Sequence, residues 1–217
     1  MNYIAIDTAS PVLKVLARYN GRTVYYQCDD FKAASVRLMP ELDKLLSELG
    51  VTPSDMDFYA CVTGPGSFTG IRICMATVKA FAYACGKPVL PVTALELLAY
   101  NNREAETAVA VCDASNGLRY VAVYDGVMHE LMSPRCLDAD ELRAFIATID
   151  EPYAVFADKK IADEIGKAIY PEFFRDAFIS AVESNLDRRI EGNKLEPLYI
   201  RKPQAESDLE MKNGAKS

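Results

Sequence analysis

The heptapeptide IAIDTAS, residues Ile4–Ser10, decides the expected fold, because a similar heptapeptide, VAVCDAS, returns at Val109–Ser115. Each begins with small and β-branched apolar residues and reaches an aspartate, Asp7 or Asp113, that small residues follow. A short apolar run of this kind is typical of a buried strand that ends in a polar turn. The repetition predicts two units of related design within one chain.

The elements expected around the two heptapeptides repeat as well. In both halves we expect the order strand, strand, strand, helix, strand, helix. In the first half the segments are Tyr3–Asp7, Val12–Tyr19, Arg22–Gln27, Ser35–Leu49, Phe58–Thr63 and Thr69–Cys85, followed by a strand at Val89–Val92 and a helix from the Thr93–Glu96 capping box to about Tyr100. Asn20-Gly21 predicts a tight hairpin between the second and third strands.

The second half starts with a strand at Thr107–Asp113. Strands are expected at Leu118–Tyr124, Val127–Met132 and Tyr153–Ala157. A helix from Asp138 or Asp140 to Ile149 precedes the last of these strands. Meanders joined to crossover helices imply mixed sheets with helices packed on them. We therefore expect an α/β protein with the duplicated actin-like (ribonuclease H-like, ASKHA) fold. Its predicted parts are an N-terminal subdomain at 1–103, a C-terminal subdomain at 104–205 and a flexible polar tail at 206–217.

Composition narrows the classes of function. The 217 residues carry 24 Lys and Arg against 31 Asp and Glu, and a net charge of −7 is unfavourable for gripping a polyanion alone. With one histidine and six scattered cysteines, we expect no metal site and reduced thiols, and we expect His129 at the surface. No secretory signal and no membrane-spanning run is visible, so we expect a cytoplasmic protein with no membrane partner.

A glycine-rich stretch, TGPGSFTGIRI at Thr63–Ile73, joins an expected strand to an expected helix. Its spacing fits neither the P-loop, nor the dinucleotide fingerprint, nor the nucleophile elbow of serine hydrolases. A rigid strand-to-helix turn and an anion-binding helix start both fit these residues. The residues assigned to the turn are Gly64, Pro65, Gly66, Ser67, Thr69 and Gly70.

The helix behind this turn is apolar nearly all round, as IRICMATVKAFAYAC at Ile71–Cys85 shows. Such a helix should be buried on every side, and one sheet can cover only one of its faces. Burial by the chain itself and burial by a partner both fit, and we favour a protein–protein interface that also uses the Ser35–Leu49 helix. The predicted interface residues are Leu38, Leu42, Leu45, Leu46, Ile73, Ala76, Thr77 and Ala80.

An enzyme is the competing hypothesis. Asp7 and Asp113 follow strands where an actin-like ATPase or phosphotransferase would hold a metal and a nucleotide. The segment DTASPVLKV at Asp7–Val15, however, lacks the glycine that lets a backbone approach phosphates. Strand termination and turn capping also account for both aspartates.

Three motifs together, TGPGSFTGIRI, GKPVLPVTALELLA and LEPLYIRKP, resemble the TsaB (YeaZ) family over nearly the whole chain. The resemblance implies a non-catalytic subunit needed to make threonylcarbamoyladenosine (t6A) at position 37 of tRNA. It implies pairing with the catalytic paralogue TsaD through helices, recruitment of the ATPase TsaE, contact with tRNA only through the complex, and a homodimer when the chain is alone. It implies no cofactor, with ATP or ADP only at the complex interface.

The resemblance also bears on metal and on older peptidase assignments of this family. TsaD holds a metal with paired histidines on the helix that corresponds to Ser35–Leu49, and here that region reads AASVRLMPEL. Ala34 stands where the TsaB family often has a histidine. No catalytic residue and no metal ligand is therefore expected. The extended segment Leu195–Pro203 fits an edge strand or a partner contact equally well.

Overall fold

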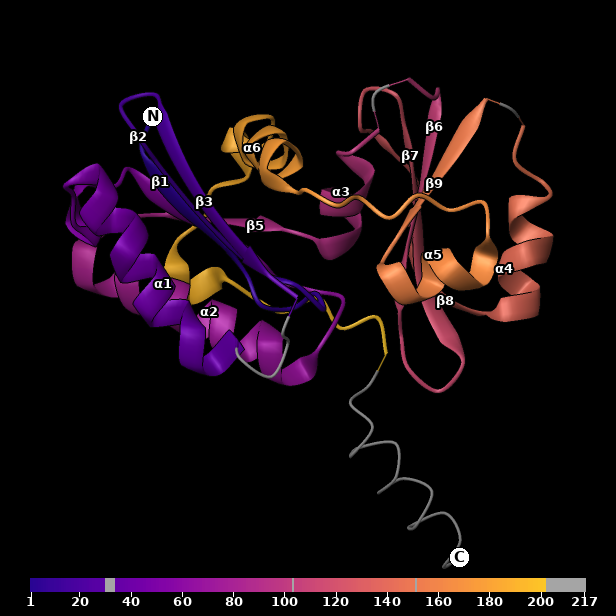
Figure 1. The fold of residues 1–217 in the computed structure, drawn as a ribbon, viewed down its shortest axis with the longest axis horizontal. Coiled ribbons are helices and arrows are strands. Elements are labelled where there is room, and N and C mark those ends of the chain that lie inside the picture. Colours follow the sequence, from indigo (N-terminus) through magenta and orange to yellow (C-terminus); the bar gives the residue numbers. More distant parts are fainter. Residues whose placement is uncertain (30–33, 103, 151, 202–217) are drawn as a thin grey trace, which may run out of the picture.

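A computed structural model describes residues 1–29, 34–102, 104–150 and 152–201 and shows two lobes, each built on one mixed sheet (Figure 1). The strand order is β3-β2-β1-β4-β5 in the first sheet and β8-β7-β6-β9 in the second. Each sheet thus places its third, second, first and fourth strands side by side. The chain has the duplicated actin-like α/β fold that the repeated heptapeptides predict.

The first sheet forms from a meander and two crossovers. Its strands are β1 (Tyr3–Asp7), β2 (Leu13–Tyr19), β3 (Arg22–Cys28), β4 (Phe58–Val62) and β5 (Val89–Val92). Asn20 and Gly21 have φ angles of 47° and 82°, which confirms the hairpin, because this turn needs positive φ at both positions. β4 and β5 run parallel to β1 after the crossover helices, so the carboxyl ends of β1 and β4 meet at one edge.

Three helices accompany this sheet. They are α1 (Ala34–Leu49), α2 (Phe68–Cys85) and the short α3 (Ala94–Ala99). α1 and α2 lie on one side of the sheet, and α3 lies between the two lobes (Figure 1). The capping box of α3 is formed as predicted: Glu96 N–H donates to Thr93 Oγ1 at 3.0 Å, and Thr93 N–H donates to Glu96 Oε2 at 2.7 Å.

The second lobe repeats the design. Its elements are β6 (Thr107–Asp113), β7 (Leu118–Asp125), β8 (Glu130–Asp138), α4 (Ala139–Ile146), β9 (Tyr153–Ala157) and α5 (Lys159–Ile165). Asp138 caps α4 by accepting from Asp140 and Glu141 N–H groups, both at 2.8 Å. α4 and α5 cover the outer face of the sheet, while α3 packs on its inner face.

The third strand of this lobe starts later than predicted. Asp125 Oδ1 accepts the N–H groups of Val127 and His129 at 3.0 Å and 2.8 Å, and Met128 between them has a φ of 70°. These residues therefore form a turn, and the strand begins at Glu130 in place of Val127. His129 lies in the turn with 80% of its side chain exposed, and its Nδ1 lies 3.1 Å from Asp125 Oδ2.

The end of the chain returns to the first lobe. α6 (Arg175–Glu183) lies on the side of the first sheet opposite α1 and α2 (Figure 1), and its residues Phe178, Ala181 and Val182 are buried in the core of that lobe. Two single 3-10 turns follow at Leu186–Arg188 and Gly192–Lys194, and Ile190 pairs with Val89 at the sheet edge. The part of the predicted C-terminal subdomain beyond 173 is thus packed with the N-terminal one. Residues 206–217, predicted to be a tail, lie outside the described residues.

Within the described part of the chain, no helix combines the length and the apolar character needed to cross a membrane.

Candidate functional site

The glycine-rich turn packs closely against the turn that follows β1. A Cβ atom at Gly70 would lie 1.8 Å from the carbonyl oxygen of Thr8, and one at Gly66 would lie 2.3 Å from that of Ala9. Ser67 N–H donates to Ala9 O at 2.9 Å, and Thr8 Oγ1 donates to Gly70 O at 2.6 Å. Only glycine permits this approach of two backbones. The geometry supports the rigid-turn interpretation of the motif.

Two backbone donors at the start of α2 are used within the chain itself. Ser67 caps the helix by accepting from Gly70 N–H at 3.2 Å, while its own N–H is used by Ala9 O. Pro65 has no N–H, and Thr69 is exposed and not the cap. The Ser67 and Gly70 N–H groups are therefore occupied, and an anion at this turn would have to bind through the N–H groups of Phe68 and Thr69 at the start of α2.

Asp7 is fully buried and saturated with donors. Its Oδ1 accepts the N–H groups of Ala9 and Ser10 at 2.9 Å and 3.0 Å, and its Oδ2 accepts from Ser10 Oγ at 2.5 Å and from Lys14 Nζ at 2.8 Å. A carboxylate offers about four lone-pair positions, so these four donors use them all. Lys14 is itself 1% exposed, which makes the pair a buried ion pair.

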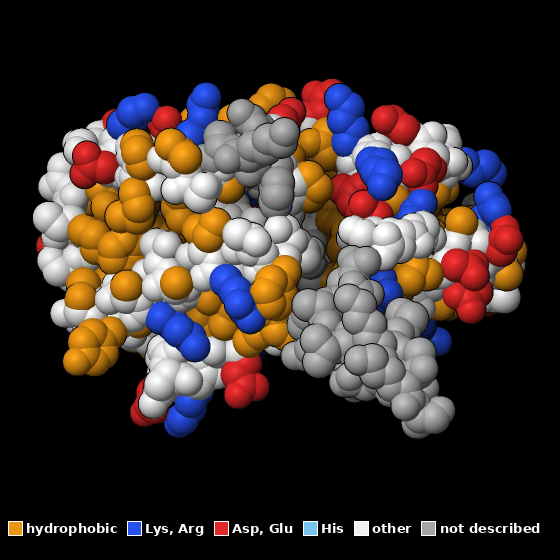
Figure 2. Space-filling model, turned by 90° about the horizontal axis from the view of Figure 1, so that it is seen from below, with side chains coloured by type: hydrophobic (Ala, Val, Ile, Leu, Met, Phe, Trp, Pro, Cys, Tyr) orange, Lys and Arg blue, Asp and Glu red, His pale blue; other side chains and the backbone are white. Residues whose placement is uncertain are grey.

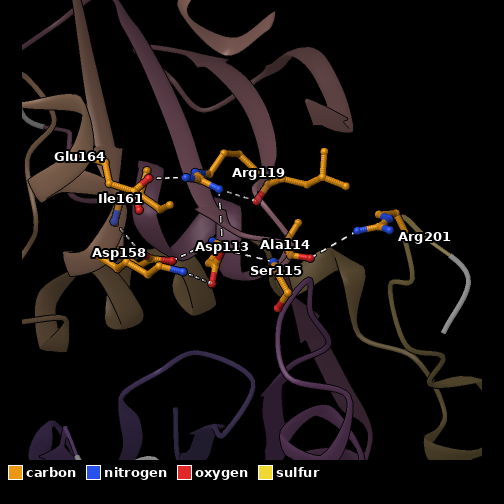
Figure 3. A network of polar contacts seen from close by, with 10 residues as sticks. Asp113, Ala114, Ser115, Arg119, Asp158, Ile161, Glu164 and Arg201 are labelled. Carbon is orange, nitrogen blue, oxygen red and sulfur yellow. Dashed lines mark hydrogen bonds and ion pairs between the residues drawn. The ribbon is translucent and has the colours of Figure 1, made fainter. Parts of the chain in front are cut away.

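Asp113 occupies the matching place in the second lobe, at the end of β6 (Figure 3). Its carboxylate lies 3.1 Å from Lys160 Nζ and 3.9 Å from Arg119 Nη1, and Arg119 also pairs with Glu164. Both aspartates therefore end a strand, and both are neutralised by basic residues of their own lobe. Asp113 differs in being partly exposed.

Asp158, which the sequence analysis did not single out, completes this network (Figure 3). It follows β9, accepts the N–H of Asp113 at 2.8 Å and caps α5 through the N–H of Ile161 at 3.2 Å. Burial raises the pKa of Asp158, and the neighbouring Asp113 charge adds to this effect, while the two hydrogen bonds oppose it. An N-cap pattern before α5 was the signal that could have identified it.

A cleft of about 760 Å³ lies between the two lobes. It is lined by residues of the turns that follow β1 and β6. Asp113 and Asp158 face it from the second lobe, whereas Asp7 lies beneath its floor, behind Lys14. Aromatic rings supply much of the remaining wall, namely Phe68, Tyr120, Tyr170, Phe174 and Tyr199. Phe174 and Tyr170 come from the returning segment, and no local sequence pattern marks them as cleft residues.

Thiols and metal donors are dispersed. All six cysteines are free, and burial raises the pKa of the Cys74 and Cys112 thiols well above the ordinary value. Among the described residues, no group of three or more His, Cys, Asp or Glu side chains could hold a metal ion.

The predicted interface residues separate into two sets. Leu38, Leu42, Leu45 and Leu46 are at most 8% exposed, because the leucine stripe of α1 packs on the first sheet. These four leucines therefore belong to the core of this chain, and a partner could not contact them in this arrangement. On α2, Ile73 and Thr77 are half-buried, and Ala76 and Ala80 are exposed.

The exposed apolar surface of these helices contains larger side chains than predicted. Tyr83 is 93% exposed, Val36 74% and Met39 50%. Figure 2 shows hydrophobic side chains gathered over the first lobe on the side where α1 and α2 lie, whereas charged side chains dominate the second lobe. We call the set Val36, Met39, Ile73, Ala76, Ala80 and Tyr83 the helical face.

An aromatic stack stands where α2 begins, at the mouth of the cleft. Phe68 stacks on Tyr199 with ring centroids 5.6 Å apart, and the Arg72 guanidinium lies 3.8 Å from the centre of the Phe68 ring. Leu198 N–H donates to Thr63 O at 2.9 Å, which fixes the segment carrying Tyr199 to the glycine-rich turn. The described part of the Leu195–Pro203 segment, up to Arg201, thus contacts this chain's own turn.

Comparison with known proteins finds relatives whose names refer to tRNA modification. The family model described as "TsaD: tRNA N6-adenosine threonylcarbamoyltransferase" matches residues 31–146. Proteins named "tRNA threonylcarbamoyladenosine biosynthesis protein TsaB" are similar: that of Bacillus subtilis is 33% identical over 126 residues (57% of this chain, 55% of the relative). That of Escherichia coli is 30% identical over 139 residues (59% of each). The match spans little more than half the length of these curated relatives.

A solved structure resembles nearly the whole chain. "YeaZ from Pseudomonas aeruginosa" has a TM-score of 0.75 and 25% sequence identity, and the alignment covers 91% of this chain and 99% of that one. The likeness therefore extends over both lobes.

Proposed function

Since the chain belongs to the TsaB/YeaZ family, we propose that it is a non-catalytic subunit needed for threonylcarbamoylation of adenosine 37 in tRNA. Its role is to hold a catalytic partner through the helical face. The observation that carries this proposal is the exposure of that face, above all of Tyr83, on a helix whose charged side chains are Arg72 and Lys79. Contiguous exposed apolar surface on a protein of this size marks an interaction site.

The shape of α2 fits another helix. Ala76 and Ala80 are one turn apart, and their small side chains let a second helix approach closely. Tyr83 on α2, and Val36 and Met39 on α1, are larger exposed apolar side chains of the same pair of helices. Burial of one large apolar side chain contributes about 1.5–3 kcal/mol, so a few such groups can drive association.

A TsaD-like paralogue is the partner that we propose. The family model that matches residues 31–146 includes both α1 and α2, so a paralogue would present a helix pair of related design. Two related faces can meet about an approximate two-fold axis, as the same face does in a homodimer of this chain when the paralogue is absent. A TsaE-like ATPase then joins the pair.

tRNA is bound by the complex and not by this subunit alone. The net charge of −7 opposes a polyanion, because phosphate contacts dominate nucleic-acid affinity. We propose that the chain takes no cofactor of its own and that ATP or ADP binds, if anywhere near it, at the interface of the complex.

The experiment is light scattering after gel filtration, with and without the TsaD-like protein of the same organism. We expect a homodimer alone, a heterodimer in the mixture, and loss of both for Ala76→Arg and Ala80→Glu. Val127→Arg, at a position exposed in the second lobe, is the matched control and should assemble normally. A wild-type monomer together with full heterodimer formation by both α2 variants would remove the proposal.

The competing function is an actin-like ATPase or phosphotransferase. The cleft and its two strand-ending aspartates favour it, whereas the saturated hydrogen bonds of Asp7 oppose it, because a metal would need a free carboxylate oxygen. Incubation of the isolated chain with Mg·ATP should release no phosphate above the level of an Asp113→Asn control. Turnover that this substitution abolishes would establish the enzyme.

A further inference from the structure

The ammonium group of Lys14 lies in a cage of three different kinds of group. Its Nζ lies 2.8 Å from Asp7 Oδ2, 3.4 Å from the carbonyl oxygen of Val12 and 4.2 Å from the centre of the Phe174 ring. A carboxylate, a carbonyl and the face of an aromatic ring are the groups with which proteins bind organic cations. Lys14 is 1% exposed, so the charge is removed from water almost completely.

The cage stands at the floor of the cleft and is assembled from three distant segments. Asp7 ends β1, Lys14 belongs to β2, and Phe174 comes from the segment that returns before α6. Lys14 and Phe174 both line the cleft, and Asp7 lies directly behind the ammonium. Ala9 and Ser10, which also donate to Asp7, line the cleft too, so anything that enters from the cleft meets these donors before it meets the carboxylate.

Asp7 holds the positively charged Lys14 ammonium strongly in this position. A buried carboxylate without a cation costs several kcal/mol, so Asp7 requires a positive partner as long as it stays ionised. The tether of the lysine side chain makes its ammonium an intramolecular ligand with a high effective concentration. A free metal ion would have to displace this tethered group and would find the remaining lone pairs of Asp7 occupied by Ala9 and Ser10.

We propose that the floor of the cleft is a cation site that the chain fills with its own Lys14 ammonium, which closes the cleft to metal-bound polyphosphates. This inference concerns the cleft and does not depend on the proposed partner. It assigns Lys14 the place that a metal ion would need beside Asp7.

Chemical rescue tests the cation site. Lys14→Ala leaves Cβ in place, and n-propylammonium supplies the three methylene carbons and the ammonium that the substitution removes. We expect a melting temperature below that of wild type, and a rise along a saturating curve when n-propylammonium is added. 1-Propanol, which has the same carbon chain without the charge, should not reproduce the rise. Wild type and the double variant Asp7→Asn/Lys14→Ala should not respond to the amine.

Three results would contradict the proposed cation site. An unsaturable response, an equal response to 1-propanol, or an equal response of the double variant would show that no cation site exists. Should Lys14→Ala fail to fold alone, the yield of folded protein after refolding with each additive gives the same comparison. Closure is tested on wild type: Mg·ATP should leave its melting temperature unchanged. A stabilisation by Mg·ATP that Asp7→Asn removes would show that a metal reaches Asp7 past Lys14.

Discussion

At the scale of single residues, the two glycine positions in contact with the β1 turn differ from the glycines at exposed turns. Gly70 has a carbonyl oxygen where its Cβ would be, whereas Gly86, at the end of α2, has a φ of 65° and open space around it. At Gly70 a neighbouring carbonyl oxygen excludes a side chain, whereas at Gly86 only the positive φ disfavours one. The sequence motif predicted a tight turn but not which backbone it would meet, because the partner segment lies some sixty residues earlier in the chain.

This distinction gives a prediction for stability. Gly70→Ala should lower the free energy of unfolding by about 3 kcal/mol or more, because two backbones must separate to admit one methyl group. Gly86→Ala should cost only about 1 kcal/mol, the ordinary penalty for a left-handed alanine. Urea unfolding of both variants measures the difference. Equal costs would mean that the turn and the β1 loop are not in contact.

Asp158 provides a prediction with pH dependence. Because burial raises its pKa in the folded protein above the ordinary 3.8, the protonated form favours folding. Its contribution is therefore fully present below pH 3.8 and is lost as pH rises through the folded-state pKa. Asp158→Asn keeps a competent N-cap for α5 and removes the titration.

We expect the melting temperature of Asp158→Asn, relative to wild type, to increase as pH rises from 4 through the folded-state pKa of Asp158 and then to level off. Thermal melts in buffers of equal ionic strength measure this difference. Asp140→Asn, at an exposed position in α4, is the control and should show little change. A difference that stays constant over the range, or that falls, would contradict the assigned effect of burial.

At the scale of elements, α1 shows what helical periodicity can and cannot predict. The leucine stripe correctly marks the helix between Ala34 and Leu49. Periodicity identifies an apolar face, but it does not say whether the chain's own sheet or a partner covers that face. Here the first sheet covers the leucines, whereas Met39, which periodicity places at the edge of the stripe, is 50% exposed, and Val36, which lies outside the stripe, is 74% exposed. Ala34, at the start of the helix, is buried.

The buried leucine stripe of α1 and the exposed helical face should respond differently when a side chain is truncated to alanine. Leu42→Ala removes a side chain that is 1% exposed and should cost about 2–5 kcal/mol of folding stability. Tyr83→Ala should change stability by no more than about 0.5 kcal/mol, because the side chain is 93% exposed. Its effect should appear as at least tenfold weaker self-association in sedimentation equilibrium. Unchanged association would exclude Tyr83 from the interface.

At the scale of the whole molecule, the repeated heptapeptides and the repeated order of elements along the chain together predicted two lobes of related design. They could not predict the cation cage, because Lys14 and Phe174 meet only after the chain has completed the second lobe and returned. The return itself has a weak local signal: α6 is a short helix, and its buried residues match a sheet face formed 80 or more positions earlier. Contacts of such long range leave no pattern in a local window.

A fragment experiment tests this dependence. Residues 1–103 expressed alone should lack a cooperative thermal transition, because the sheet face that α6 covers would be open to water. Circular dichroism during heating, compared with the full chain, is the measurement. A sharp transition in the fragment would show that the first lobe is stable without the returning segment.

The position of α6 also sets an order for synthesis on the ribosome. β1, the middle strand of the first sheet, leaves the exit tunnel at the beginning of translation, and the helix that shields it leaves close to the end. The outer core of the second lobe is built from residues 107–165, so it can form while the first lobe still lacks α6. Nascent chains of this protein should therefore acquire protection against proteases in the later-made half first, against the usual N-to-C order of domain maturation.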